Sequence, residues 1–160
     1  MKKRAAIQQL ALLAGTVLLA GLDQISKKVM TGILRDGTVL RPLPGILELE
    51  YVENRGMAFG LMQGKRGWFL LFYGIAMALI WYSAVRPPVK KHKLWSLALV
   101  LTAGGATGNA IDRLLHSYVT DFISFKLIDF PVFNLADCFV VCGCALMCLL
   151  LLTDSGEERD

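Results

Sequence analysis

Carboxylate, amide and basic side chains stand at several points of this sequence where an apolar run ends or begins. Ionisable groups at the edge of an apolar layer are unfavourable unless they are paired or have a function. Two carboxylates held close together do not both ionise easily, so they share a proton and leave one acidic and one basic group. Such a pair can activate water for attack on a peptide carbonyl, as in an aspartic peptidase. The candidate residues are Asp23, Lys27, Asn109, Asp112, Arg113, Asp121, Asn134 and Asp137.

Other catalytic chemistries fit the sequence less well. No serine is accompanied by a histidine and an acid, and the predicted topology puts His92 and His116 on opposite sides of a membrane. The cysteines lie in one apolar run, scatter over more than one face of a helix, and have no histidine or carboxylate at zinc-site spacing. We interpret them as small packing residues and expect no metal or other cofactor. They are Cys138, Cys142, Cys144 and Cys148.

Four long apolar stretches must position the candidate residues. Hydrophobic residues make up 55% of the chain, above the ~45–50% of soluble domains. Each stretch approaches the ~20 residues that cross the hydrocarbon layer as a helix. We therefore predict an all-α membrane protein with a single domain over residues 1–160. The predicted spans are residues 5–22, 68–85, 94–110 and 135–152.

The distribution of cations predicts the orientation. Lys2, Lys3 and Arg4 precede the first span, and the sequence RPPVKKHK at 86–93 separates the second from the third. Cationic loops favour the cytoplasmic side, so both termini are expected inside and the segments 23–67 and 111–134 outside. Cations in the first outer segment weaken this rule. The N-terminus also fits a cleaved signal peptide, but we expect the first span to be retained.

The outer segments contain strand and glycine patterns. Apolar and acidic residues alternate over 46–52, which predicts a strand. The sequence RPLPG at 41–45 predicts a turn before it, and 38–40 a short partner strand. We expect a small extracytoplasmic sheet resting on the membrane. Gly56, Gly60 and Gly64 recur every fourth residue, which indicates an interfacial loop or helix, with a surface turn as the alternative. Gly104 and Gly108 predict close helix packing in the third span.

With the N-terminus inside, the ends of the first and third spans and the start of the fourth meet at the outer face. Local explanations exist for individual residues. Asn134 and Asp137 fit a capping box at a helix start, and Asp112 fits an ion pair with Arg113 or Lys27. Asp121 alone fits a solvated loop. These explanations do not account for the gathering of all these polar residues at one face of the membrane. An acid at a helix C-terminus needs a cation, but sequence reasoning leaves either Asp112 or Asp121 as the partner of Asp137.

Five short motifs stand in order along the chain: DQISK from Asp23, NRGMAFG from Asn54, GNAIDR from Gly108, VTDFI from Val119 and FNLAD from Phe133. Together they resemble the bacterial lipoprotein signal peptidase family, also called signal peptidase II. The resemblance covers nearly the whole chain. It implies that Asp121 and Asp137 form the catalytic dyad. It also implies that a second set holds the substrate and the site geometry. That set is Asp23, Lys27, Asn54, Gly56, Asn109, Asp112, Arg113 and Asn134. Met57 and Cys138 depart from the residues usual in the family.

The resemblance also implies a substrate and a location. The family's peptidases cut prolipoproteins on the amino side of a cysteine that carries a diacylglyceryl group, in the bacterial cytoplasmic membrane. We expect such prolipoproteins and membrane lipids as partners, no nucleic acid, and a monomer. The alternatives from other classes are a small proton-coupled transporter and a structural membrane subunit. Transporters keep their acids near the bilayer midplane, whereas the interiors of these spans lack acids.

Overall fold

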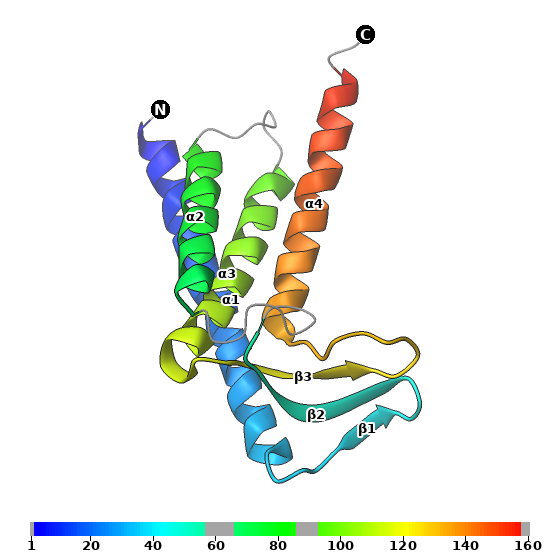
Figure 1. Ribbon diagram of the computed structural model, residues 1–160. Helices are drawn as coiled ribbons and strands as arrows, with labels where there is room; N and C mark the ends of the chain where they lie inside the picture. Colours follow the sequence, from blue (N-terminus) through cyan, green and yellow to red (C-terminus); the bar gives the residue numbers. More distant parts are fainter. Residues whose placement is uncertain (1, 57–65, 86–92, 158–160) are drawn as a thin grey trace.

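The computed structural model describes residues 2–56, 66–85 and 93–157 (Figure 1). Four helices carry the chain back and forth, and a small antiparallel sheet lies at the end opposite the two termini. The interfacial segment predicted around Gly60 and Gly64, together with Met57, lies outside the described residues. The elements are α1 (Lys2–Leu34), β1 (Leu40–Leu43), β2 (Leu47–Asn54), α2 (Arg66–Val85), α3 (Lys93–His116), β3 (Val119–Phe125) and α4 (Leu135–Glu157).

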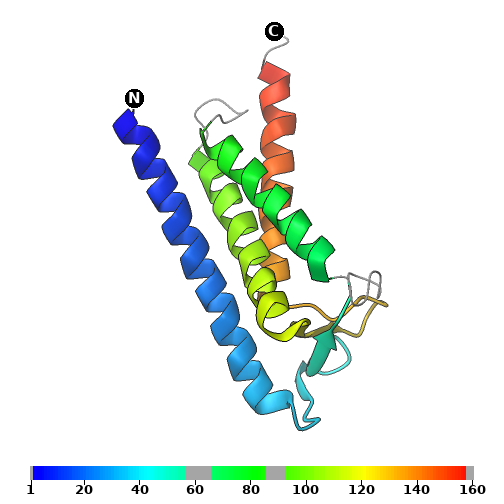
Figure 2. The same cartoon turned by 60° about the vertical axis from the view of Figure 1, so that its left-hand side comes forward.

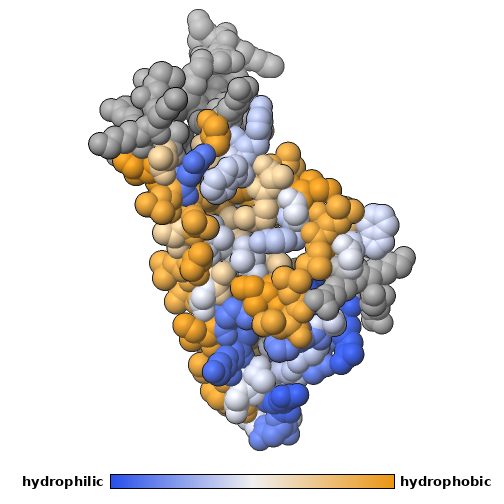
Figure 3. Space-filling model, turned by 90° about the vertical axis from the view of Figure 1, so that its left-hand side faces the viewer, coloured by the Kyte–Doolittle hydropathy of each residue, from blue (hydrophilic) through white to orange (hydrophobic). Residues whose placement is uncertain are grey.

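All four helices are long enough and apolar enough to cross a membrane. Large apolar side chains such as Val17, Leu79 and Val141 remain exposed on the helices. The space-filling view shows apolar residues over most of the helical part and hydrophilic residues gathered at the sheet end (Figure 3). This pattern fits helices whose outer faces contact lipid, and it confirms the predicted class of four-span helical membrane protein. The spanning stretches are Ala6–Leu34, Gly67–Val85, Leu94–Leu115 and Leu135–Thr153.

Helix α3 is the central helix, because it packs against each of the other three. The buried core forms around Trp95, Leu99 and Ala103 of α3, against Leu12 of α1 and Ile80 of α2. The glycine pattern of α3 explains how α1 approaches it. A Cβ on Gly104 would collide with Leu19, and one on Gly108 would collide with Asp23. The prediction that Gly104 and Gly108 permit close helix packing is therefore confirmed.

Helix α1 is longer than the predicted first span. It continues as one helix past residue 22 to Leu34 and runs down to the sheet (Figure 2). Asp23, Lys27 and Leu34 on this continuation are each at most 3% exposed. They are buried by tertiary contacts, which a hydropathy pattern does not report. The polar residues near Asp23 therefore lie within the helix rather than in a segment beyond it.

The sheet has the order β1-β2-β3, with antiparallel neighbours. The predicted strand at 46–52 is present as β2, and its partner β1 begins at Leu40. The predicted turn at 41–45 is partly wrong, because residues 41–43 belong to β1 and the turn is at 44–46, where Gly45 has φ +77°. Strand β3 was not predicted. It lies in the segment 111–134 and carries Asp121, so the interpretation of this residue as a solvated loop acid is wrong.

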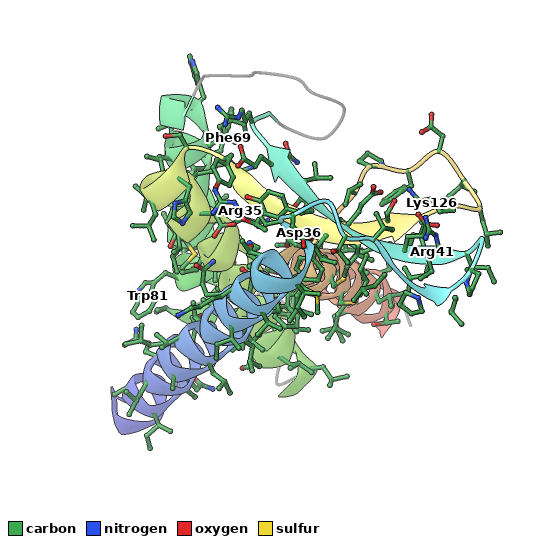
Figure 4. All side chains as sticks on the ribbon, turned by 90° about the horizontal axis from the view of Figure 1, so that it is seen from below. Arg35, Asp36, Arg41, Phe69, Trp81 and Lys126 are labelled. Atoms are coloured by element: carbon green, nitrogen blue, oxygen red, sulfur yellow. The ribbon has the colours of Figure 1, made fainter. Side chains whose placement is uncertain are left out.

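Ion pairs cover the solvent-facing acids of β2. Arg41 Nε lies 3.0 Å from Glu48, and Lys126 Nζ lies 2.8 Å from Glu50. Figure 4 shows Arg41 and Lys126 together at the end of the sheet far from Phe69. Since exposed ion pairs contribute little to stability, the sheet is held mainly by its strand pairing and its contacts with α1 and α3.

Candidate active site

Asp121 is buried in the middle of β3. Its side chain is 2% exposed, and both of its carboxylate oxygens accept hydrogen bonds. Asn54 Nδ2 donates to Oδ2 over 2.9 Å, and Asn134 Nδ2 donates to Oδ1 over 2.6 Å. Asn54 comes from the end of β2, the strand paired with β3. The sheet therefore supplies this acid together with its first amide partner.

Asp137 lies in the first turn of α4. The backbone N–H of Asp137 donates to Asn134 Oδ1 over 3.0 Å, and the Asn134 backbone N–H donates to Asp137 Oδ2 over 3.2 Å. This reciprocal pair is a capping box, so that prediction is confirmed. The other oxygen, Oδ1, accepts a 2.7 Å hydrogen bond from Asn109 Nδ2 of α3. The helix cap thus fixes the position of the second acid.

Asn134 connects the two aspartates. It is completely buried, and its amide nitrogen donates to Asp121 and also to Asn109 Oδ1 over 3.1 Å. The preceding residue, Phe133, pairs with β3 through backbone hydrogen bonds to Phe122 and Ile123. Because Phe133 is fixed beside β3, Asn134 must lie next to Asp121. Asn134 therefore caps α4 and also belongs to the polar cluster around the two aspartates.

Asp121 and Asp137 line the same cavity of about 250 Å³. The cavity has one polar wall and one apolar wall. The polar wall carries Asn54, Asn109 and Arg113 with the two acids, and the apolar wall is formed by residues 130–133 and Val119. A polar centre beside an apolar wall is suited to a peptide bond flanked by apolar groups.

The environment raises the pKa of Asp121 to about 6, from an ordinary value of 3.8. Burial is the main cause, because it disfavours the charged form. The hydrogen bond from Asn54 lowers the pKa, and the negative charge of Asp137 raises it. A carboxyl group with this pKa remains partly protonated near neutral pH, as the acid member of a dyad must.

Lys27 of α1 is bound to its own helix and to α3. Its ammonium lies 2.8 Å from Asp23 Oδ2, 3.1 Å from Asp112 Oδ2 and 2.9 Å from Asn109 Oδ1. An ammonium has three donors, so these three acceptors satisfy it. Asp23 also accepts from the Ala136 backbone N–H over 2.9 Å, which ties α1 to the first turn of α4.

Asp112 belongs to the Lys27 cluster. Besides its ion pair with Lys27, it accepts hydrogen bonds from the Thr120 N–H over 2.9 Å and from Gln24 Nε2 over 2.8 Å. The expectation that Asp112 needs a cation is met by Lys27. Among the cavity-lining residues the second acid is Asp121 and not Asp112. The geometry therefore favours Asp121 as the neighbour of Asp137.

Gly56 and Arg113 complete the predicted set. The Gly56 N–H donates to Asn54 Oδ1 over 3.1 Å, so it orients the amide that contacts Asp121. Arg113 Nη1 donates to the Asn109 carbonyl over 3.4 Å, and its guanidinium lies over the Phe69 ring, 4.3 Å from the centroid. Of the two ion pairs predicted for Asp112, the structure has the one with Lys27, whereas the Arg113 side chain lines the cavity.

Sequence reasoning missed Gln24. Gln24 Nε2 donates to Asp112 and to the Gly108 carbonyl over 3.1 Å. The Ser26 hydroxyl donates to the Asp23 carbonyl of its own helix over 2.7 Å, so it stays outside the polar cluster. An amide between two charged residues in a spanning helix was a signal that could have identified Gln24.

Comparisons with known proteins identify the family. Residues 15–153 match the family model described as Signal peptidase (SPase) II. A lipoprotein signal peptidase of Caldicellulosiruptor bescii is 40% identical over 86% of this chain and 87% of its own length. One of Clostridioides difficile is 37% identical over 89% of this chain and 95% of its own. A solved bacterial membrane enzyme has a TM-score of 0.85 at 28% identity, covering 94% of this chain and 92% of its own. The chain therefore belongs to the signal peptidase II family, and it is a membrane peptidase of the aspartic type.

Proposed function

We propose that this chain removes signal peptides from diacylglyceryl-modified prolipoproteins, cutting on the amino side of the lipidated cysteine, with Asp121 and Asp137 as the catalytic dyad. One observation carries the site assignment. Asp121 and Asp137 line one cavity, and both accept hydrogen bonds from Asn134. The family's name supports the substrate class, and the apolar wall of the cavity supports an acylated substrate.

The two acids have different environments, which assigns their roles. Asp137 lies at the N-terminal end of α4, where the helix dipole stabilises a negative charge. It is the base that takes a proton from water as the water oxygen attacks the scissile carbonyl. Asp121, whose pKa is raised by burial, is the acid that protonates the carbonyl oxygen. Asp137 then gives its proton to the leaving nitrogen, the C–N bond breaks, and Asp121 regains its proton from the hydroxyl. No step needs a cofactor.

The remaining polar residues hold this geometry. Asn54 and Asn134 fix Asp121, and Asn109 fixes Asp137. Lys27 anchors the Asn109 amide by a hydrogen bond to its oxygen. Arg113 lines the cavity as its cation, so it is placed to polarise the substrate carbonyl as the water attacks. A monomeric enzyme is part of this proposal.

The proposed location is the bacterial cytoplasmic membrane, with the termini inside and the cavity at the outer face. The cations before α1 and between α2 and α3 favour the cytoplasmic side. Both termini lie at one end of the molecule, and the sheet lies at the other (Figure 1). A substrate whose acyl chains stay in the bilayer would then present its peptide bond at the level of the cavity.

The test is cleavage of a lipidated precursor by the purified protein in detergent, with the products identified by mass. Asp121→Asn and Asp137→Asn are each expected to abolish cleavage. Asp129→Asn is the matched control, because Asp129 is exposed on the loop after β3. The same precursor without its diacylglyceryl group should remain uncut. Retained cleavage in Asp121→Asn would remove this residue from the dyad.

The same assay separates the rival functions. A proton-coupled transporter finds no support in the family assignment, since that family consists of peptidases. A purely structural subunit predicts that neutralising both acids changes assembly and no reaction. A product that begins with the lipidated cysteine would exclude both alternatives.

A further inference from the structure

Helix α2 faces α3 with one line of side chains. Phe69, Tyr73, Met77 and Ile80 recur at helical spacing. Ile80 belongs to the buried core with Trp95 and Leu99, and Met77 packs against it. The Tyr73 hydroxyl lies 3.2 Å from Thr107 Oγ1 of α3. Phe69 is the member of this line closest to the sheet end. Trp68 and Phe72 of the same helix contact each other and are about half exposed.

Phe69 meets the cation of the candidate active site. The guanidinium carbon of Arg113 lies over the Phe69 ring, 4.3 Å from its centroid. This is well within the roughly 6 Å over which a cation is attracted to a ring face. Figure 4, seen from the sheet end, places Phe69 on α2. Arg113 also lines the cavity, and its charge interacts with those of Asp137 and Asp121.

We infer that Phe69 is a positioning residue for catalysis, which holds the Arg113 guanidinium toward the cavity so that its N–H groups are free for the substrate carbonyl. This inference rests on the proposed function. A ring face binds a guanidinium without using its N–H groups, whereas an acidic partner would occupy them. The hydrogen bond to Asn109 is long, at 3.4 Å, so it restrains the long side chain of Arg113 weakly. The aromatic ring supplies the missing restraint.

Four variants test the inference in the precursor assay. Phe69→Leu keeps an apolar side chain but removes the ring, so kcat should fall about tenfold while KM changes little. Phe69→Tyr and Phe69→Trp keep a ring face and should retain activity near that of the unaltered chain. Phe72→Leu, at a half-exposed position of the same helix whose ring contacts Trp68, is the matched control and should have no effect. Thermal unfolding of each variant in detergent separates a loss of folded protein from a loss of catalysis.

A second measurement does not depend on activity. In protein labelled with ¹⁵N-arginine, the Arg113 side-chain N–H signal should be shifted by the ring current of Phe69. Arg113→Lys identifies the signal by its disappearance. Phe69→Leu should return it to the position of ordinary arginines, and Phe72→Leu should leave it shifted.

The outcomes are distinct. A precursor cut by the unaltered chain, with a selective loss of kcat in Phe69→Leu and rescue by Tyr and Trp, supports the inference. Full activity in Phe69→Leu, equal losses in all three Phe69 variants, or an unshifted Arg113 signal would each overturn it while leaving the proposed function intact. No cleavage by the unaltered chain would reject the proposed function and the inference together.

Discussion

Replacing Lys27 by methionine is the perturbation that the structure makes most informative. Methionine has a similar length but no charge, so it removes the ammonium and leaves Asp23, Asp112 and the Asn109 amide oxygen behind. Asp23 is 0% exposed and Asp112 is 3% exposed. Two buried carboxylates that had shared one cation would then face each other without it.

The magnitude follows from the burial of the cluster. Removing one partner of a buried ion pair destabilises a protein by about 3–5 kcal/mol, because the remaining charge is uncompensated. At roughly 2–4 °C per kcal/mol for a chain of this size, Lys27→Met should lower the thermal midpoint by about 6–20 °C. Adding Asp112→Asn to Lys27→Met removes one of the two opposed charges, so the double variant should recover part of this loss.

The assay is thermal unfolding in detergent, followed by tryptophan fluorescence. Lys28→Met is the matched control, since Lys28 is the exposed neighbour on the same helix and should unfold near the unaltered midpoint. Lys27→Met should also cleave precursor poorly at temperatures where it remains folded, because Asn109 loses its anchor and Asp137 loses a fixed donor. A Lys27→Met midpoint equal to that of Lys28→Met would refute the reasoning.

Two further predictions concern stability. Burial raises the pKa of Asp121 from 3.8 to about 6, so its contribution to folding is favourable below pH 4 and is lost as the pH rises toward 6. Asp121→Asn should therefore raise the thermal midpoint at pH 7 and not at pH 4. An equal change at both pH values would contradict this pKa. A Cβ on Gly105 would collide with the Ala136 carbonyl and Val140 of α4, whereas one on Gly74 meets nothing within 4 Å. Gly105→Ala should therefore lower the thermal midpoint. Gly74→Ala should leave it unchanged or raise it, because alanine is favoured over glycine in helices by about 1 kcal/mol. Similar effects at both sites would show that α3 and α4 do not pack this closely.

The sequence by itself determined the four helices and the local geometry around Asp137. Long apolar runs predict spanning helices because composition and length are sufficient signals. The capping box of Asn134 and Asp137 depends on residues three positions apart, so it was also visible. The motifs indicated the family, which the comparisons confirmed.

Only the tertiary structure decided which polar residues face one another. Strand β3 has both faces covered over residues 119–122, so its sequence lacks the alternation that reveals a half-buried strand. Asp121 approaches Asp137 because Phe133 pairs with Ile123, a contact that no local pattern encodes. The extension of α1 to Leu34 likewise depends on burial against other elements. Local propensity predicts elements, whereas the pairing of distant segments fixes the chemistry between them.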